Sequence, residues 1–274
     1  MPQVLPRIAV ALALAVSTMA GMAHAGELTL NDSVYSFSSP GNLYGPWSIQ
    51  TLRYQEQMGK DVPSITLLNR NDADRPKQSD ARAAYLDDYH AWSPGFYTYA
   101  QVSVASGQIL PYRMAYLEAD AKLNAKRNFV LGLGLADMQN PDGSATRFAS
   151  IGPSYYAGPM VYTLRFMPSN TNGINTSATE LVTEYSVLGR DQVTFTLVDG
   201  SQPSVLVGFP PSLVTFQRLF EADLTVKHWI RPNFGIILGG TLGNHYDRAT
   251  GASIYHERGI TLGIFFGRAV GLPR

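Results

Sequence analysis

Apolar and polar residues alternate along most of the chain, in segments of about ten residues separated by turn-forming residues. The clearest segment spans residues 127–137, where Phe129, Leu131, Leu133 and Leu135 occupy every second position and small residues lie between them. Successive side chains of a β-strand point to opposite faces, so this period of two predicts strands with one apolar face. The same alternation is present in residues 113–123, 218–228, 232–244 and 259–267, and a first strand is expected at residues 27–37.

The connections between these segments are predicted to alternate in length. Short turns are expected at residues 57–61, 91–95, 125–128, 157–159, 188–191 and 229–233. Longer polar connections are expected at residues 38–45, 70–82, 107–112, 138–144, 168–177, 199–213 and 247–254. A β-sandwich also has alternating strands, but it gives no reason for short connections at one end and long ones at the other.

Segments of about 9–12 residues are longer than typical globular strands of ~5–6 residues and match tilted strands that cross a membrane. The pattern therefore predicts an all-β protein, a single antiparallel transmembrane β-barrel without a transmembrane helix. We expect about 14 strands, with 12 as the alternative.

The first 25 residues differ from the rest of the chain. Arg7 precedes an apolar run at residues 8–20, and Ala23-His24-Ala25 offers the small residues of a cleavage site. This run is shorter than the ~20 residues that a transmembrane helix needs. We predict a cleaved secretory signal peptide at residues 1–25, an outer-membrane barrel domain at residues 26–274, and export to the cell outer membrane.

Composition excludes several classes of protein. Charged residues make up 15% of the chain and the formal net charge is zero, which argues against a nucleic-acid partner. The absence of cysteine excludes disulfides, thiolate metal sites and thiol catalysis. Aromatic residues close to the expected strand ends are interpreted as interfacial girdles, with ordinary strand aromatics as the alternative. They are Trp47, Tyr89, Trp92, Tyr97, Tyr112, Tyr155, Tyr156, Trp229, Tyr246 and Tyr255.

Few residues form the pattern of a catalytic site. Asp87 faces away from Asp88 on a strand, and the cluster they form with His90 lies near an expected periplasmic turn. The segments 245–247 and 256–257 flank the last long loop and carry His–carboxylate combinations suited to acid–base or metal chemistry. A solvated loop explains these combinations more simply. We therefore expect no catalytic residues, no metal and no cofactor.

Charged residues on the polar faces of the strands form the main candidate site. Charges at membrane depth are tolerated only inside a barrel, in water or paired with one another. Two interpretations stay open, an ion-paired plug and a water-filled passage that leans acidic and favours cations. The candidates are Glu118, Asp120, Lys122, Arg165, Glu184, Glu221, Asp223, Lys227 and Glu257.

The chain resembles the YaiO-type outer-membrane β-barrel proteins. The likeness is clearest in the hairpin Gly158-Pro159-Met160-Val161-Tyr162-Thr163-Leu164-Arg165-Phe166, and it continues from Phe220 through the turn at residues 229–232 to residues 236–243. The resemblance implies a membrane barrel without established catalytic residues, and some members are thought to accompany envelope-polysaccharide genes. One departure is that Phe266 is followed by eight further residues, whereas outer-membrane barrels usually end in an aromatic residue.

Two classes of function follow from the sequence. The first is a non-enzymatic outer-membrane barrel of Gram-negative type, a narrow pore or an accessory for the passage of envelope polysaccharide or exopolysaccharide. The second is a surface barrel enzyme that hydrolyses lipid or peptide at its extracellular rim. The expected partners are outer-membrane lipid and lipopolysaccharide, the outer-membrane assembly machinery and polysaccharide, with no nucleic acid.

Overall fold

The computed structural model describes residues 26–39, 45–73, 79–107, 109–187, 190–201 and 217–267. The predicted signal peptide at residues 1–25 and most of the loop expected at residues 199–213 lie outside these ranges. No helix among the described residues is long and apolar enough to cross a membrane. The strands are β1 Gly26–Ser38, β2 Trp47–Glu56, β3 Asp61–Asp72, β4 Ser79–Ser93, β5 Phe96–Gly107, β6 Arg113–Lys122, β7 Phe129–Gln139, β8 Ala145–Ala157, β9 Met160–Thr171, β10 Ile174–Val187, β11 Asp191–Gly200, β12 Gln217–Arg231, β13 Phe234–Asp247 and β14 Ser253–Gly267.

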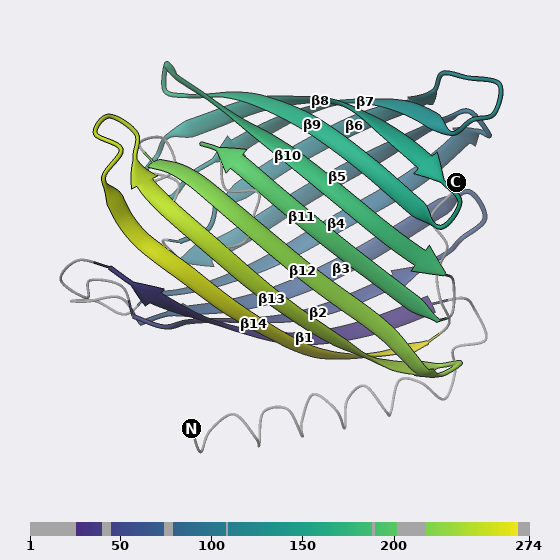
Figure 1. Cartoon of the computed structure of the whole chain (residues 1–274), viewed down its shortest axis with the longest axis horizontal. Helices are drawn as coiled ribbons and strands as arrows, with labels where there is room; N and C mark the ends of the chain where they lie inside the picture. The colour runs from purple at the N-terminus through teal and green to yellow at the C-terminus, as the bar shows by residue number, and fades with distance from the viewer. Residues whose placement is uncertain are drawn as a thin grey trace.

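These strands form one closed barrel, in which they run at a slant to its length (Figure 1). Each strand pairs antiparallel with its neighbours in sequence, and β14 returns to pair with β1. Val34 of β1, for example, lies opposite Ser48 of β2 on one side and Ile260 of β14 on the other. Closure leaves no open sheet edge, so the backbone polar groups of the strands are paired within the wall. The predicted fold and the count of 14 strands are confirmed, and the alternative of 12 is wrong.

The connections differ from the prediction most clearly at the β9–β10 hairpin. Smaller differences are the connection after β6, which spans residues 123–128 where a turn at 125–128 was expected, and that after β3, which is shorter than the expected 70–82 because β3 ends at Asp72 and β4 begins at Ser79. A long connection was expected at residues 168–177, but β9 continues to Thr171 and β10 begins at Ile174. The turn between them is Asn172-Gly173, with φ of 49° and 86°. Asn and Gly tolerate positive φ at low cost, and this pair is the preferred sequence of a tight β-hairpin turn. The polar residues on either side are strand residues, since Ser169 and Thr176 pair through hydroxyl groups 2.5 Å apart.

Large apolar side chains cover the outer face of the barrel. Leu135 is 70% exposed, Ile260 is 65% exposed and Leu117 is 58% exposed, and similar residues extend around the wall. An apolar surface of this extent is unfavourable in water and fits contact with lipid tails. Leu133 and Leu224 are also exposed, at 53% and 46%, so the outward face matches the one inferred from alternation.

Most of the aromatic residues assigned to interfacial girdles lie on the inner face, which makes that interpretation wrong for them. Trp47 and Tyr255 are each 1% exposed. Tyr89, Tyr97, Tyr156 and Trp229 also occupy inner positions. Trp92 and Tyr155 do face outward, with 59% and 47% exposure, whereas Tyr112 is 42% exposed in the connection before β6. Successive residues at the end of a strand point alternately into the lumen and outward, so nearness to a strand end does not determine which face a side chain takes.

Candidate functional site

The charged residues expected inside the barrel occupy alternate positions, on the side opposite the exposed apolar residues. Glu118, Asp120, Glu221 and Glu257 are each at most 6% exposed. The structure does not join the expected residues into one ring. They are Glu118, Asp120 and Lys122 on β6, Arg165 on β9, Glu184 on β10, Glu221, Asp223 and Lys227 on β12, and Glu257 on β14.

The first group centres on Arg165. Its guanidinium lies 3.0 Å from the carboxylate of Glu118 on β6 and 3.4 Å from that of Glu180 on β10. The contact with Glu118 crosses β7 and β8, where Gly132 and Gly152 lie opposite each other in the register. A Cβ at Gly132 would lie 2.8 Å from Asp120 Oδ1 and 3.5 Å from Glu118 Oε1. The glycines therefore let this ion pair lie flat along the wall.

Two further ion pairs lie on the inner face. Lys227 pairs with Glu27 of β1, and its ammonium lies 4.8 Å from the ring centroid of Trp229. Arg53 of β2 pairs at 3.1 Å with Asp87 of β4. Glu27, Arg53 and Glu180 were not among the predicted site residues, although the alternation of their strands places them on the inner face. The ammonium of Lys122 lies 5.8 Å from the ring centroid of Tyr97, and Glu184 occupies an inner position of β10.

A row of aromatic rings lines the wall beside the Arg165 group. The ring centroids of Tyr89 and Tyr99 are 4.6 Å apart, and those of Tyr99 and Tyr116 are 6.0 Å apart. Tyr116 stacks on Phe148 with centroids 5.8 Å apart. The row therefore runs across β4, β5, β6 and β8. Tyrosine offers an apolar ring together with a hydroxyl that hydrogen-bonds, so this wall can bind amphipathic solutes.

The end of the barrel that carries the β5–β6 loop is narrowed by apolar side chains. Ile109 and Leu110 of this loop are each 4% exposed. They pack against inward residues of three strands, Ile49 of β2, Leu68 of β3, and Ala81 and Ala83 of β4. Burial of loop residues against the inner face shows that this loop folds over the lumen.

Close to the same end, Arg70 is fully buried. It forms a bidentate contact with Asp72, at 2.7 and 2.6 Å, and its guanidinium lies 4.4 Å from the ring centroid of Trp47. Two parallel N–H···O bonds fix the orientation of both side chains, and the indole covers the guanidinium. These contacts hold both side chains in place at this rim of the lumen.

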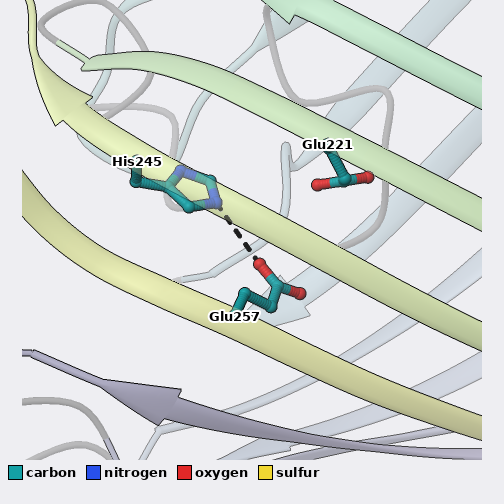
Figure 2. Close-up of side chains that lie close together, drawn as sticks. All are labelled: Glu221, His245 and Glu257. Carbon is teal, nitrogen blue, oxygen red and sulfur yellow. Dashed lines mark ion pairs between the residues drawn. The ribbon is translucent and has the colours of Figure 1, made fainter.

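The last group joins three strands. Glu221 of β12, His245 of β13 and Glu257 of β14 are buried, and one nitrogen or oxygen of each lies within 4.8 Å of the others. Figure 2 shows the three side chains and the contact of 3.4 Å between His245 Nε2 and Glu257 Oε2. From the sequence, His245 and Glu257 were expected only on opposite sides of the last long loop. Glu221 was predicted to face the lumen, but its place beside His245 and Glu257 could not be predicted, because the register of three strands brings them together.

The remaining candidates are kept apart by the fold. Asp87 faces inward and accepts a hydrogen bond from Ser64, whereas Asp88 accepts one from the backbone N–H of Val62. His90 pairs with Asp61, 2.5 Å away. His256 contacts Asn244 on the exposed side of the β13–β14 hairpin. These side chains therefore do not assemble into a common site.

The closed barrel, its apolar outer face and its charged interior define a membrane β-barrel. The chain belongs to the YaiO membrane β-barrel domain family, whose model matches residues 25–205. No curated protein sequence matches the chain.

Solved structures of a hydrocarbon channel, a polysaccharide secretin and a toluene transporter share the fold. The CymD monoaromatic hydrocarbon channel aligns with a TM-score of 0.60 at 7% identity, covering 94% of this chain and 92% of that one. A bacterial polysaccharide outer membrane secretin aligns with a TM-score of 0.53 at 11% identity, covering 89% and 98%. The P. putida toluene transporter TodX aligns with a TM-score of 0.52 at 9% identity, covering 90% of each chain. At these identities the similarity is one of fold alone.

Proposed function

We propose that the protein is a non-enzymatic outer-membrane barrel of Gram-negative type, exported by its signal peptide, whose narrow lumen passes segments of envelope saccharide. The observation that carries this proposal is the inner wall, which combines a row of tyrosines with flat-lying ion pairs. Rings offer their faces to sugar rings, and the charged groups offer hydrogen-bond partners to hydroxyls. A wall with both kinds of group suits a polar chain that slides past it.

The size of the barrel supports a passage. A barrel of about 8 strands is filled by its own side chains, and one with more strands encloses more space. Ion pairing along the wall keeps Arg165 and Glu118 close to the strands and away from the axis. The folded-in segment with Ile109 and Leu110 is the constriction, so the resting conductance should be small.

The arrangement gives no specific support to a hydrolase. Asp88 and His90 take the face opposite Asp87, and they lie beside the short turn between β4 and β5. A surface enzyme needs its nucleophile, base and acid on one face at the outer rim. We therefore propose passage in place of catalysis.

Planar-bilayer recordings on the purified barrel test the proposal. We expect a small conductance with weak cation preference, reduced by added oligosaccharide that enters the lumen. The double variant Glu118→Gln/Asp120→Asn should lose the cation preference and stay folded, because Arg165 keeps Glu180 as its partner. Asp137→Asn is the matched control, since that carboxylate is exposed and pairs with Arg147 on the outer face.

The constriction provides a second arm of the same test. Ile109→Ser/Leu110→Ser should raise the conductance. Serine side chains gain little from packing against the apolar residues of β2, β3 and β4, so the β5–β6 loop should leave the lumen more readily. If neither the wild-type protein nor this variant conducts, the passage is refuted. If conductance is unaffected by any oligosaccharide, the saccharide part of the proposal fails while a general pore remains.

A further inference from the structure

Gly243 is the centre of the Glu221–His245–Glu257 group. In the strand register Gly243 lies opposite Glu221 on one side and Glu257 on the other, so the two carboxylates flank a position that has no side chain. A Cβ at Gly243 would lie 3.3 Å from His245 Nε2 and 3.5 Å from Glu257 Oε2. His245 Nε2 and Glu257 Oε2 thus point into the space that the missing side chain of Gly243 leaves open.

The imidazole is held in place by a neighbour. Its ring stacks on Tyr255 with centroids 4.0 Å apart and an interplanar angle of 20°. His245 is 0% exposed and Tyr255 is 1% exposed. A ring that is buried and stacked keeps Nε2 directed at the two carboxylates, as the supporting residues of a ligand site do.

The charge of this group is not balanced by a basic side chain. Glu27, Asp87 and Glu118 each pair with a Lys or Arg, whereas no described Lys or Arg forms an ion pair with Glu221 or Glu257. Asp223, whose carboxylate accepts a hydrogen bond from Thr241 at 2.5 Å, is a further negative neighbour of Glu221. Glu257 Oε2 is buried and accepts no hydrogen bond among the described residues. Buried carboxylates without a fixed cation require a proton or a bound cation.

We infer that Glu221, His245 and Glu257 form a binding site for a divalent transition-metal ion, with Zn²⁺ as the representative. One imidazole nitrogen and two carboxylate oxygens are a ligand set that Zn²⁺ accepts, with bonds of ~2.0–2.2 Å. The ligand atoms lie within 4.8 Å of one another, so small side-chain rotations bring them to one ion. The inference does not depend on whether the barrel conducts.

The nitrogen ligand gives the site its selectivity. Imidazole suits Zn²⁺, Cu²⁺ and Ni²⁺, whereas Ca²⁺ and Mg²⁺ prefer oxygen ligands alone. Loss of the imidazole should therefore weaken Zn²⁺ binding and leave the weak binding of Ca²⁺ unchanged.

Zn²⁺ titration of the full-length barrel in detergent, by calorimetry or by competition with a chromophoric chelator, tests the inference. We expect one saturable site in the wild-type protein, weakened roughly tenfold or more by His245→Gln and by Glu257→Gln. Gly243→Ala should weaken binding without removing a ligand, because its Cβ occupies the space at His245 Nε2. Ca²⁺ in large excess should not displace Zn²⁺.

His228→Gln is the matched control, since His228 is exposed and contacts the carboxylate of Asp191 at 2.7 Å, and no second carboxylate of the described residues forms an ion pair with it. It should bind Zn²⁺ as the wild type does. The inference is overturned if the wild type shows no saturable binding, if His228→Gln weakens binding as much as His245→Gln, or if Ca²⁺ competes equally. Should the His245 variant fail to fold, the electron paramagnetic resonance spectrum of Cu²⁺ on the wild-type barrel decides, because nitrogen coupling must be present and must survive in His228→Gln.

Discussion

Replacing Arg165 with methionine should destabilise the barrel, because the carboxylates of Glu118 and Glu180 on the inner face then lose their positively charged partner. The side chains of Glu118 and Glu180 are 7% and 14% exposed, and that of Arg165 is 36% exposed. Removing one partner of a fully buried pair costs ~3–5 kcal/mol, whereas an exposed pair is worth ~1 kcal/mol or less. The partial exposure of Arg165 places the expected loss between these limits, at ~2–4 kcal/mol.

Urea unfolding of the barrel in detergent micelles, followed by tryptophan fluorescence, measures this loss, since the chain has 3 tryptophans. The triple variant Arg165→Met/Glu118→Gln/Glu180→Gln should recover most of it, because no buried charge is then left unpaired. A loss below ~1 kcal/mol, or a triple variant no more stable than the single one, would refute the reasoning and show that water screens these charges.

Four other predictions use the same barrel. Leu133→Arg, on the outer face, should cost ~2–4 kcal/mol in urea unfolding, and an unchanged stability would contradict the outward assignment. Asp32 lies on the outer side of β1 opposite Leu262, so Asp32→Leu should raise stability by ~1–2 kcal/mol; a loss would show that protein covers this position. Gly134→Ala should cost ~1–3 kcal/mol, since its Cβ would lie 2.4 Å from a tyrosine hydroxyl of β6, and no loss would contradict that close contact. In the cysteine-free chain, Ala249→Cys should react with an impermeant maleimide on intact cells and Lys126→Cys only after lysis, and the reverse pattern would invert the orientation.

The fold could be predicted from the sequence because the two chemical faces of each strand are visible in it. Leu117 and Glu118 are adjacent in the chain and lie on opposite sides of the wall. The turn at Asn172-Gly173 was also present in the sequence, as a strong hairpin signal. The sequence nevertheless predicts a loop there, because the strand residues on either side of this turn are polar.

The groupings within the site could not be predicted, because they depend on register. Arg165 meets Glu118 across two intervening strands, and Glu221 meets Glu257 across β13. Alternation assigns each of these residues to a face but says nothing of its height relative to a distant strand. The inward aromatic residues were misassigned for a related reason, since the phase of a strand is hardest to determine at its ends.

The pairing of β1 with β14 makes assembly of this barrel an event that depends on the whole chain. Ser33 and Thr261 face each other with hydroxyl oxygens 2.7 Å apart although 228 positions separate them in the sequence. Contacts at such separation form late, because the chain between them must first be ordered. Until β14 is made, β1 presents an open edge that invites pairing with other chains. A nascent chain released before residue 253 therefore cannot complete the wall. Its exposed strand edges should be bound by chaperones or cleaved by proteases before the chain can insert into a membrane.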